Sequence, residues 1–231
     1  MADAVAANPG GTETGRQAAG QDGRKRRQIL DGARRVFLSR GFDAASMSDI
    51  AEEAHVSKGT LYVYFDSKEL LFRELVAEEK AAQFPAIFDF DPSREDVGAE
   101  LSRVGRALVR FLVQPHVVTA KRTVVAMAER MPVLASEFFE QGPRQCTRRV
   151  AEYLDGQVAA GRLAIDDTYL AAAQFIDMSQ STLSTALMFG VEQSVDDGRI
   201  ATTVEAAVRV FLAAYSAGIA SGGRSRTRGS N

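Results

Sequence analysis

A short stretch of this sequence combines hydroxyl groups, aromatic rings and one cation at helical spacing. The side chains that would remain outside a helical core here are Ser57, Lys58, Thr60, Tyr62 and Tyr64. Hydroxyl and ammonium groups donate hydrogen bonds to phosphate oxygens and to base edges. Each residue alone would more often be an ordinary surface side chain, but together they are suited to contact with a nucleic acid.

Gly59 lies inside the same predicted helix. Glycine in a helix interior costs about 1 kcal/mol relative to alanine. Its presence indicates that the backbone comes very close to something at this position, and the DNA backbone is the candidate.

Two short helices joined by a tight turn would hold these side chains. Ser46 followed by Asp49 predicts a capped helix start, and Ser57 is a second cap candidate after a break at 55–56. The second helix is expected at about 58–65. The residues that would hold both helices against a preceding helix are Ile50, Ala51, Val56, Leu61 and Phe65. Residues 46–65 therefore predict a helix-turn-helix, in which His55 serves the turn.

Helical periodicity continues on both sides of this motif. A helix is expected over about 24–40, and Asp66 with Glu69 predicts a capping box for a helix that runs to about Gln83, before Pro85. Later helices are expected at about 93–114, 116–130, 133–160, 167–190 and 198–219. No alternating pattern bounded by hairpin turns is present. The sequence predicts an all-α fold, with a three-helix N-terminal domain over 24–83, an antiparallel helical bundle over 84–220, a disordered tail over 1–23 and a flexible basic tail over 221–231.

Composition and charge restrict the class of protein. The 231 residues are 45% hydrophobic and 25% charged, and the net charge of −2 argues against a protein that coats nucleic acids indiscriminately. A local basic cluster, Arg24 to Arg27, opens the first predicted helix and is as well explained by solvation as by DNA contact. No apolar stretch approaches the roughly 18 to 20 residues that span a bilayer, and the start of the chain lacks the pattern of a signal peptide, so a cytoplasmic protein without membrane contact is expected.

An enzyme is a poor alternative. Cys146 and His116 are the only nucleophile and base that a cysteine mechanism could use, and no Gly-rich phosphate loop or zinc-ligand spacing is present. One cysteine and two histidines cannot form a structural zinc site. We expect no catalytic activity and no metal or other cofactor.

The segment from Ser46 to Leu70 closely resembles the signature of the TetR (tetracycline repressor-like) family of transcriptional regulators, and the resemblance covers about residues 23–83. It implies an all-α homodimer in which the N-terminal domain binds a palindromic operator and the C-terminal domain binds a small molecule that releases the DNA. Repression is the expected activity, with activation left open. The pattern beyond residue 115 resembles the AcrR- and AefR-like members.

The resemblance also implies roles for individual residues. Ser46 would cap the first helix of the motif, Ser48 and Lys58 would contact bases or phosphates, and Gly59 would allow close approach of the DNA. The residues expected to contact the DNA backbone are Ser57, Thr60, Tyr62, Tyr64 and Lys68. Ser48 and Val63 depart from the residues that are common in the family, which blurs which bases are read.

The C-terminal domain is rich in phenylalanine and methionine, most of which would fill a core. Met127, Phe175 and Met178 lie mid-helix beside small or polar residues and are predicted to line a ligand pocket for an apolar or amphipathic effector. Small residues in 167–190 and 198–219 predict a two-fold dimer contact. The alternative is a ligand-independent DNA-binding or protein-interaction module of the same fold, whose C-terminal core would have no cavity.

Overall fold

The structure is a computed structural model that describes residues 11–91 and 94–217, with side chains from residue 22 onward. Within these residues the chain forms eleven helices and a single β-bridge between Leu163 and Ser216, which confirms the expected all-α fold. None of these helices is long and apolar enough to cross a membrane. The chain divides into two compact units, Met1–Ala77 and Glu78–Asn231, and helix α4 (Lys68–Ile87) runs from one into the other.

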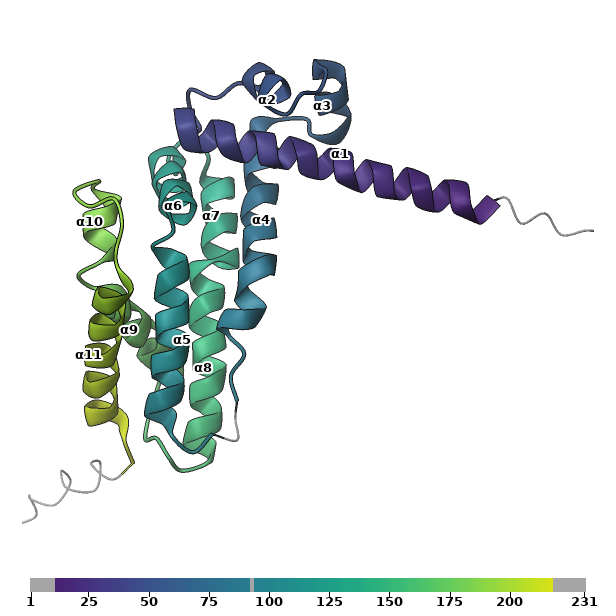
Figure 1. Cartoon of the computed structure of the whole chain (residues 1–231). Helices are drawn as coiled ribbons and strands as arrows, with labels where there is room; N and C mark the ends of the chain where they lie inside the picture. Colours follow the sequence, from purple (N-terminus) through teal and green to yellow (C-terminus); the bar gives the residue numbers. More distant parts are fainter. Residues whose placement is uncertain (1–10, 92–93, 218–231) are drawn as a thin grey trace, which may run out of the picture. The chain divides into compact units, whose positions relative to one another are not determined.

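The first unit contains α1 (Gly11–Arg40), α2 (Met47–Glu53), α3 (Lys58–Tyr64) and the start of α4. In Figure 1, α2 and α3 lie together beside α1. The side chains between these helices are almost wholly buried: Ile29, Leu30, Ala33, Ile50, Leu61, Phe65 and Leu71. Burial of such side chains contributes about 1.5 to 3 kcal/mol each, so this core fixes α2 and α3 on α1.

Three phenylalanines join the end of α1 to α4. The ring centroid of Phe42 lies 5.4 Å from those of both Phe37 and Phe72, and Phe37 and Phe72 are 6.1 Å apart. Gly41 adopts a left-handed φ of 77° after α1, as expected of a glycine that ends a helix. The chain therefore turns sharply at Gly41 and returns Phe42 to the core.

Helix boundaries in this unit differ from expectation in three respects. Helix α1 begins at Gly11 rather than near residue 24, so of the predicted N-terminal tail only residues 1–10 lie outside the described residues. At the start of α4 the backbone N–H of Leu70 donates to the Ser67 hydroxyl, so Ser67, and not Asp66, is the cap. Pro85 lies within α4 because it is near the helix end, where the Phe88 N–H still closes a bond to the Phe84 carbonyl.

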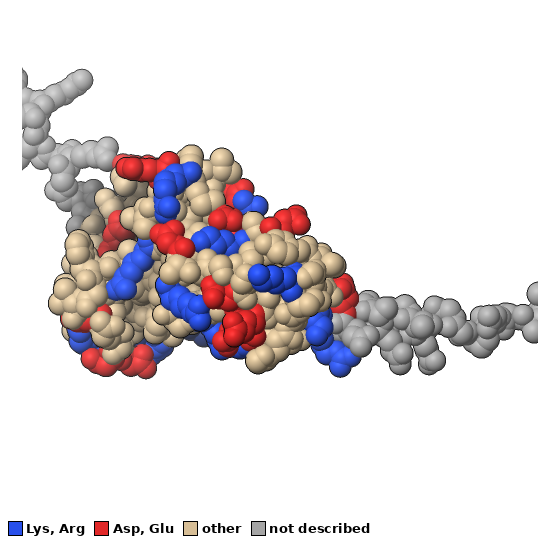
Figure 2. Space-filling view, turned by 90° about the horizontal axis from the view of Figure 1, so that it is seen from above, with Lys and Arg blue, Asp and Glu red and all other residues tan. Residues whose placement is uncertain are grey.

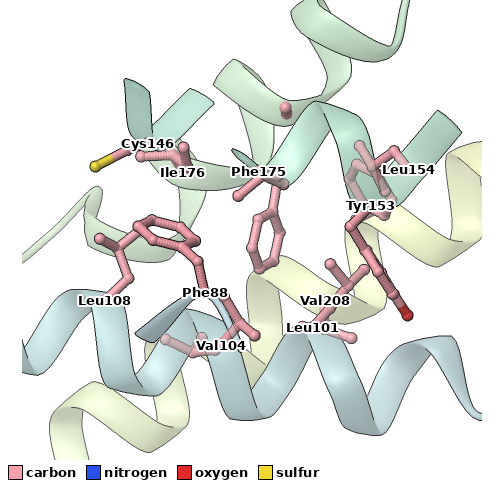
Figure 3. Close-up of a cluster of buried hydrophobic side chains, with 14 of the residues drawn as sticks. Phe88, Leu101, Val104, Leu108, Cys146, Tyr153, Leu154, Phe175, Ile176 and Val208 are labelled. Carbon is pink, nitrogen blue, oxygen red and sulfur yellow. The ribbon is translucent and has the colours of Figure 1, made fainter. Parts of the chain in front are cut away.

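The second unit continues α4 with α5 (Val97–Leu112), α6 (Pro115–Met127), α7 (Pro132–Gln141), α8 (Pro143–Ala159), α9 (Thr168–Gln180), α10 (Ser184–Met188) and α11 (Asp197–Tyr215). Helices α5, α8, α9 and α11 pack side by side. Their facing side chains form the main core, which includes Leu101, Val104, Leu108, Val150, Leu154, Phe175, Val204 and Phe211. Figure 3 shows part of this core around Leu101, Val104, Leu108 and Phe175.

Two of the long helices expected in this unit are broken. The helix expected over 133–160 is interrupted at Gly142, because Pro143 has no N–H and starts a new helix instead. The helix expected over 167–190 stops at Gln180, and α10 starts three residues after Ser181 ends the first piece. These breaks place α7 and α10 as separate short helices.

Candidate nucleic-acid interface and ligand cavity

The start of α2 is fixed by a reciprocal cap. The Asp49 N–H donates to the Ser46 hydroxyl at 3.2 Å, and the Ser46 N–H donates to the Asp49 carboxylate at 3.0 Å. The hydrogen bond from the Ser46 hydroxyl, followed by that from the Ser46 backbone and the charge of Arg40, lowers the pKa of Asp49. The capping role predicted for Ser46 is confirmed, while Ser48, two residues further on, is exposed.

The turn between α2 and α3 depends on an unusual backbone conformation at His55 and on a close approach of α2 to α1. His55 has a left-handed φ of 53°, which is unusual for a residue with a side chain. Opposite the turn, Gly32 of α1 faces Ala54, and a Cβ atom at Gly32 would lie 2.7 Å from the Ala54 Cβ and 2.9 Å from the Ala54 Cα. Helix α2 can approach α1 this closely only because residue 32 has no side chain. Sequence reasoning did not single out Gly32.

The first turn of α3 is held by its own hydroxyl groups. The Thr60 N–H donates to the Ser57 hydroxyl at 3.0 Å, and the two side-chain oxygens lie 2.8 Å apart. Both hydroxyls therefore serve the helix start as well as facing outward. Leu61 and Phe65 point inward and are buried.

The outer face of α3 consists of Lys58, Gly59, Tyr62 and Val63, all of which are exposed. The Tyr62 side chain is 50% exposed and Val63 is 81% exposed, which is unusual for residues of this size. A Cβ atom at Gly59 would meet only the Ser57 hydroxyl, at 3.8 Å, so nothing in the chain itself requires glycine there. The face leaves room for a partner that comes close to the helix backbone.

Tyr64 does not share this face. A hydrogen bond with the Asp22 carboxylate, aided by burial, raises the pKa of the Tyr64 hydroxyl. Because a carboxylate only accepts, the Tyr64 hydroxyl is the donor of this hydrogen bond to Asp22 of α1. Contact of this hydroxyl with the DNA backbone, as the sequence predicts, would compete with the bond to Asp22.

Lys68 also has an internal role instead of the predicted one. Its ammonium group donates to the carbonyls of Phe42, Asp43 and Ala45 at 2.9, 3.2 and 3.1 Å, and it lies 4.6 Å from the centre of the Phe42 ring. An ammonium group has three donors, and all three are used. Lys68 therefore fastens the loop between α1 and α2 to α4, and the prediction that it contacts phosphates does not fit this geometry.

Replacing Lys68 by methionine should lower the free energy of unfolding by about 1 to 2 kcal/mol, because three carbonyls lose a charged donor. It should leave the salt dependence of DNA affinity unchanged. Lys58→Met is the matched control, for which we expect unchanged stability and a salt slope reduced by about one unit. Chemical unfolding and DNA titration at several salt concentrations measure both quantities. A reduced slope with unchanged stability for Lys68→Met would make Lys68 a phosphate ligand after all.

The basic cluster Arg24 to Arg27 is partly used within the first unit. Arg26 forms an ion pair with Glu74 of α4 and lies 5.5 Å from the centre of the Phe65 ring. Lys25 donates to Gln28 at 3.1 Å, and Arg27 is exposed. In the view of Figure 2, the described Lys and Arg side chains are interspersed with Asp and Glu. On the face shown in Figure 2, attraction for DNA would therefore depend on a few positioned cations and not on a continuous basic surface.

Comparison with known families agrees with this arrangement. The family model for bacterial regulatory proteins of the tetR family matches residues 29–75, and the model for the C-terminal domain of AefR-like transcriptional repressors matches residues 99–217. The chain belongs to the TetR family of transcriptional regulators. As a TetR-family protein it is a DNA-binding regulator of transcription.

Two solved structures match most of the chain in fold. A TetR-family regulator from Mesorhizobium loti MAFF303099 is 27% identical with a TM-score of 0.77, and the flavonoid-responsive regulator FrrA is 33% identical with a TM-score of 0.69. Each match covers 84% of this chain and 98% of the other. Among curated proteins, an HTH-type transcriptional repressor of Mycobacterium tuberculosis is 40% identical over 55 residues, 24% of this chain and 29% of that protein. The matches to curated relatives thus span less than a third of their length.

The C-terminal unit of this TetR-family protein contains a cavity of about 570 Å³ between α6, α7, α9 and α10 that is open to solvent, with the exposed Val125 and Phe139 in its lining. Its volume is in the range of about 300 to 1,000 Å³ that is typical of small-molecule sites. Most of its lining is apolar and includes Val124, Phe138, Phe139 and Met188, whereas the polar residues Lys121, Asp177 and Gln180 also reach it.

The three predicted pocket residues do not line this cavity. Met127 is 1% exposed, and Phe175 is fully buried in the main core (Figure 3). The ring centroid of Phe175 lies 5.7 Å from that of Phe211. Met178 packs against the same core. The helical period explains the error: on α9 the cavity faces Asp177, Gln180 and Ser181, so the residues between them point elsewhere. Phe138 and Phe139, which were not among the three residues selected from the sequence, are the ones that reach the cavity.

The geometry gives no support to a cysteine mechanism. Burial raises the pKa of the Cys146 thiol to about 12, so the reactive thiolate is absent at neutral pH. His116 lies 3.1 Å from the Glu79 carboxylate. In the second unit Cys146 is thus a buried side chain of the core, and His116 has Glu79 as its neighbour.

Proposed function

We propose that this TetR-family protein is a repressor that binds a palindromic operator through the outer face of α3 and is released by a small apolar or amphipathic molecule. The exposed face of Lys58, Gly59, Tyr62 and Val63 carries the proposal. Its exposed aromatic ring and cation have no role in the core, whereas Leu61 on the opposite side of α3 and Phe65 at its end are buried, and α3 packs against α2. A rigidly held helix with such a face suits the major groove. Ser48 on α2 is exposed beside it and is the second candidate for base contact.

Replacing Gly59 by alanine tests this face. Since a methyl group meets nothing closer than 3.8 Å, the free energy of unfolding should stay equal or rise by about 0.5 to 1 kcal/mol. Affinity for an operator selected from a random duplex pool by the wild-type protein should fall about tenfold, because the helix backbone can no longer approach the DNA. Both are measured by chemical unfolding and fluorescence anisotropy.

Gly23→Ala is the matched control, because a Cβ atom there meets nothing within 4 Å and the residue lies on α1 instead of α3. It should leave operator affinity unchanged. Unchanged affinity for Gly59→Ala as well would remove α3 from the DNA interface.

A palindromic operator requires a two-fold dimer. The last helices expose apolar side chains, with Tyr169 and Leu170 of α9 at 44% and 52% and Val210 of α11 at 58%. The predicted small residues are divided: Ala171 and Ala207 are buried, whereas the alanines at 213 and 214 are exposed. Such a face is suited to an isologous contact with a second copy.

We expect sedimentation at micromolar concentration to show a dimer, and the double variant Leu170→Asp, Val210→Asp to show a monomer with unchanged helicity. A wild-type monomer under these conditions would exclude both the dimer and the palindromic operator.

Release by a small molecule is supported by the cavity and by one relative. A ligand-independent module would be expected to have a packed C-terminal unit, and the cavity of about 570 Å³ counts against that alternative. The similar protein FrrA is a flavonoid-responsive regulator, and flavonoids are small aromatic compounds. A ligand in this cavity would release the operator only if it binds the DNA-free conformation better, by a coupling of typically about 1 to 3 kcal/mol.

A further inference from the structure

Lys121 of α6 lines the cavity without a counter-charge. Among the residues that the structure describes, no carboxylate lies within ion-pair distance of the Lys121 ammonium group. The ammonium group donates no hydrogen bond to any of these residues. The side chain is only partly accessible. By contrast, most cations of this unit have partners, such as Arg103 with Glu100 and Arg199 with Glu192. Lys121 is therefore an exception that its own chain does not explain.

An unpaired cation at such a place is energetically unfavourable. Removal of water from the ammonium group lowers the pKa of Lys121. The thiol of Cys146 is close enough to interact with it, but that thiol is protonated at neutral pH and offers no full negative charge. An anion bound in the cavity would supply the missing charge and a charge-assisted hydrogen bond.

The other polar groups of the lining restrict the anion further. The Gln180 side-chain oxygen is buried and has no hydrogen-bond partner within the described part of the chain, so it needs a donor from outside. Asp177 lines the same cavity and is exposed. A lining with one cation and one carboxylate suits a single negative charge beside Lys121 and disfavours polyphosphates, because Asp177 would repel their further charges.

We propose that the cavity binds an amphipathic monoanion whose acidic group pairs with Lys121, whose hydroxyl or N–H donates to Gln180, and whose apolar or aromatic body packs against Val124, Phe138 and Met188. The description of this molecule as the effector rests on the proposed function. Its chemistry rests only on the lining of the cavity.

Two fluorescent probes with the same aromatic frame test the proposal. Anilinonaphthalenesulfonate carries one negative charge, and phenylnaphthylamine is its uncharged parent. Wild-type protein without DNA should bind the anion more tightly than the neutral probe. Lys121→Met should lower the affinity for the anionic probe by about tenfold or more. The affinity for the neutral probe should stay equal or rise, because the substitution removes only the charged partner.

Two further variants serve as controls. Arg148→Met removes an exposed cation of α8 that does not line the cavity, and it should change neither affinity. Ala135→Trp should fill the cavity and weaken both probes. The Lys121→Met protein should melt at the same temperature as wild type or higher, because an unpaired charge has been removed.

Three results would each overturn the proposal. The first is equal affinity of the anionic probe for wild type and Lys121→Met, and the second is equal affinity of this probe for wild type and Ala135→Trp. The third is tighter binding of the neutral probe than of the anionic probe to wild type. The operator-binding function is assessed separately by Gly59→Ala on DNA. If the anionic probe binds in a Lys121-dependent way but does not change operator affinity, the anion site is supported and release of the operator by a ligand in this cavity is contradicted. If a ligand releases the operator equally from wild type and Lys121→Met, the proposed function is supported and the pairing of an anion with Lys121 is contradicted.

Discussion

Replacing Gly32 by alanine is expected to bring operator affinity down to the non-specific level, about a thousandfold below wild type. The added methyl group would lie 2.7 Å from the Ala54 Cβ, 2.9 Å from its Cα and 2.9 Å from its backbone nitrogen. Flexible side chains can yield to such a contact, but here two of the three atoms are backbone. Helix α2 must therefore move away from α1, and α3 moves with it because Leu61 and Phe65 pack in the same core.

The same substitution should lower the free energy of unfolding of the first unit by about 3 kcal/mol, since overpacking against backbone leaves little room for relaxation. Chemical unfolding followed by circular dichroism measures this loss, and operator titration measures the affinity. Gly23→Ala introduces the same methyl group on the same helix, where nothing lies within 4 Å, and should raise stability slightly. A Gly32→Ala protein that binds operator as wild type would show that the spacing between α1 and α2 is not required for recognition.

Local signals predicted the helix-turn-helix well. The caps at Ser46 and Ser57 use hydrogen bonds that span three residues, so the sequence alone contains both partners. The inward positions of Leu61 and Phe65 follow from the helical period in the same way. Gly32 was not singled out, because its importance depends on Ala54, which is remote in sequence and reaches it only through the fold.

The roles of cations and hydroxyls were harder to predict for the same reason. Lys68 is at a helix start, where contact with phosphate is plausible, but the loop after Phe42 folds back and presents three carbonyls to it. Tyr64 is one helical position away from the exposed face and meets Asp22 instead. The partner of a polar side chain depends on the tertiary structure, so the helical periodicity of the sequence does not predict it.

The cavity shows a third limit. Met127 and Phe175 have the residue types of a ligand pocket, but both are buried in packed helix contacts. The break at Gly142, which separates α7 from α8, places Phe138 and Phe139 beside the cavity. A sequence that is read as one long helix over 133–160 gives no indication of this change in direction.

Glu100 of α5 is a buried charge that sequence reasoning did not notice, and its side chain is 0% exposed. The Arg103 guanidinium donates to its two oxygens at 2.7 and 3.1 Å, and the Asp91 N–H donates to it at 3.1 Å. Arg94 adds a third cationic contact at 3.3 Å. The carboxylate thus ties the loop between α4 and α5 to the bundle.

Arg103→Met is expected to lower the free energy of unfolding at pH 7 by about 2 to 4 kcal/mol, because it leaves a buried carboxylate without its main partner. The double variant Glu100→Leu, Arg103→Met should recover part of this loss, since no unpaired charge remains at residue 100. Chemical unfolding of the three proteins measures the difference. Equal stability of wild type and Arg103→Met would show that Arg94 and the Asp91 N–H suffice to hold the carboxylate.

The loss should also depend on pH in a defined direction. The hydrogen bonds from Arg103 lower the pKa of Glu100 in the folded protein, against the opposing effect of burial. In wild type the carboxylate therefore contributes stability above its unfolded pKa of about 4.3, and this contribution is lost as the pH falls through the lower folded pKa. In Arg103→Met the folded pKa rises, so protonation relieves the unpaired charge. The stability difference between the two proteins should shrink as the pH falls from 7 towards 4, whereas a difference that is constant over this range would mean that Arg103 acts through packing and not through the charge of Glu100.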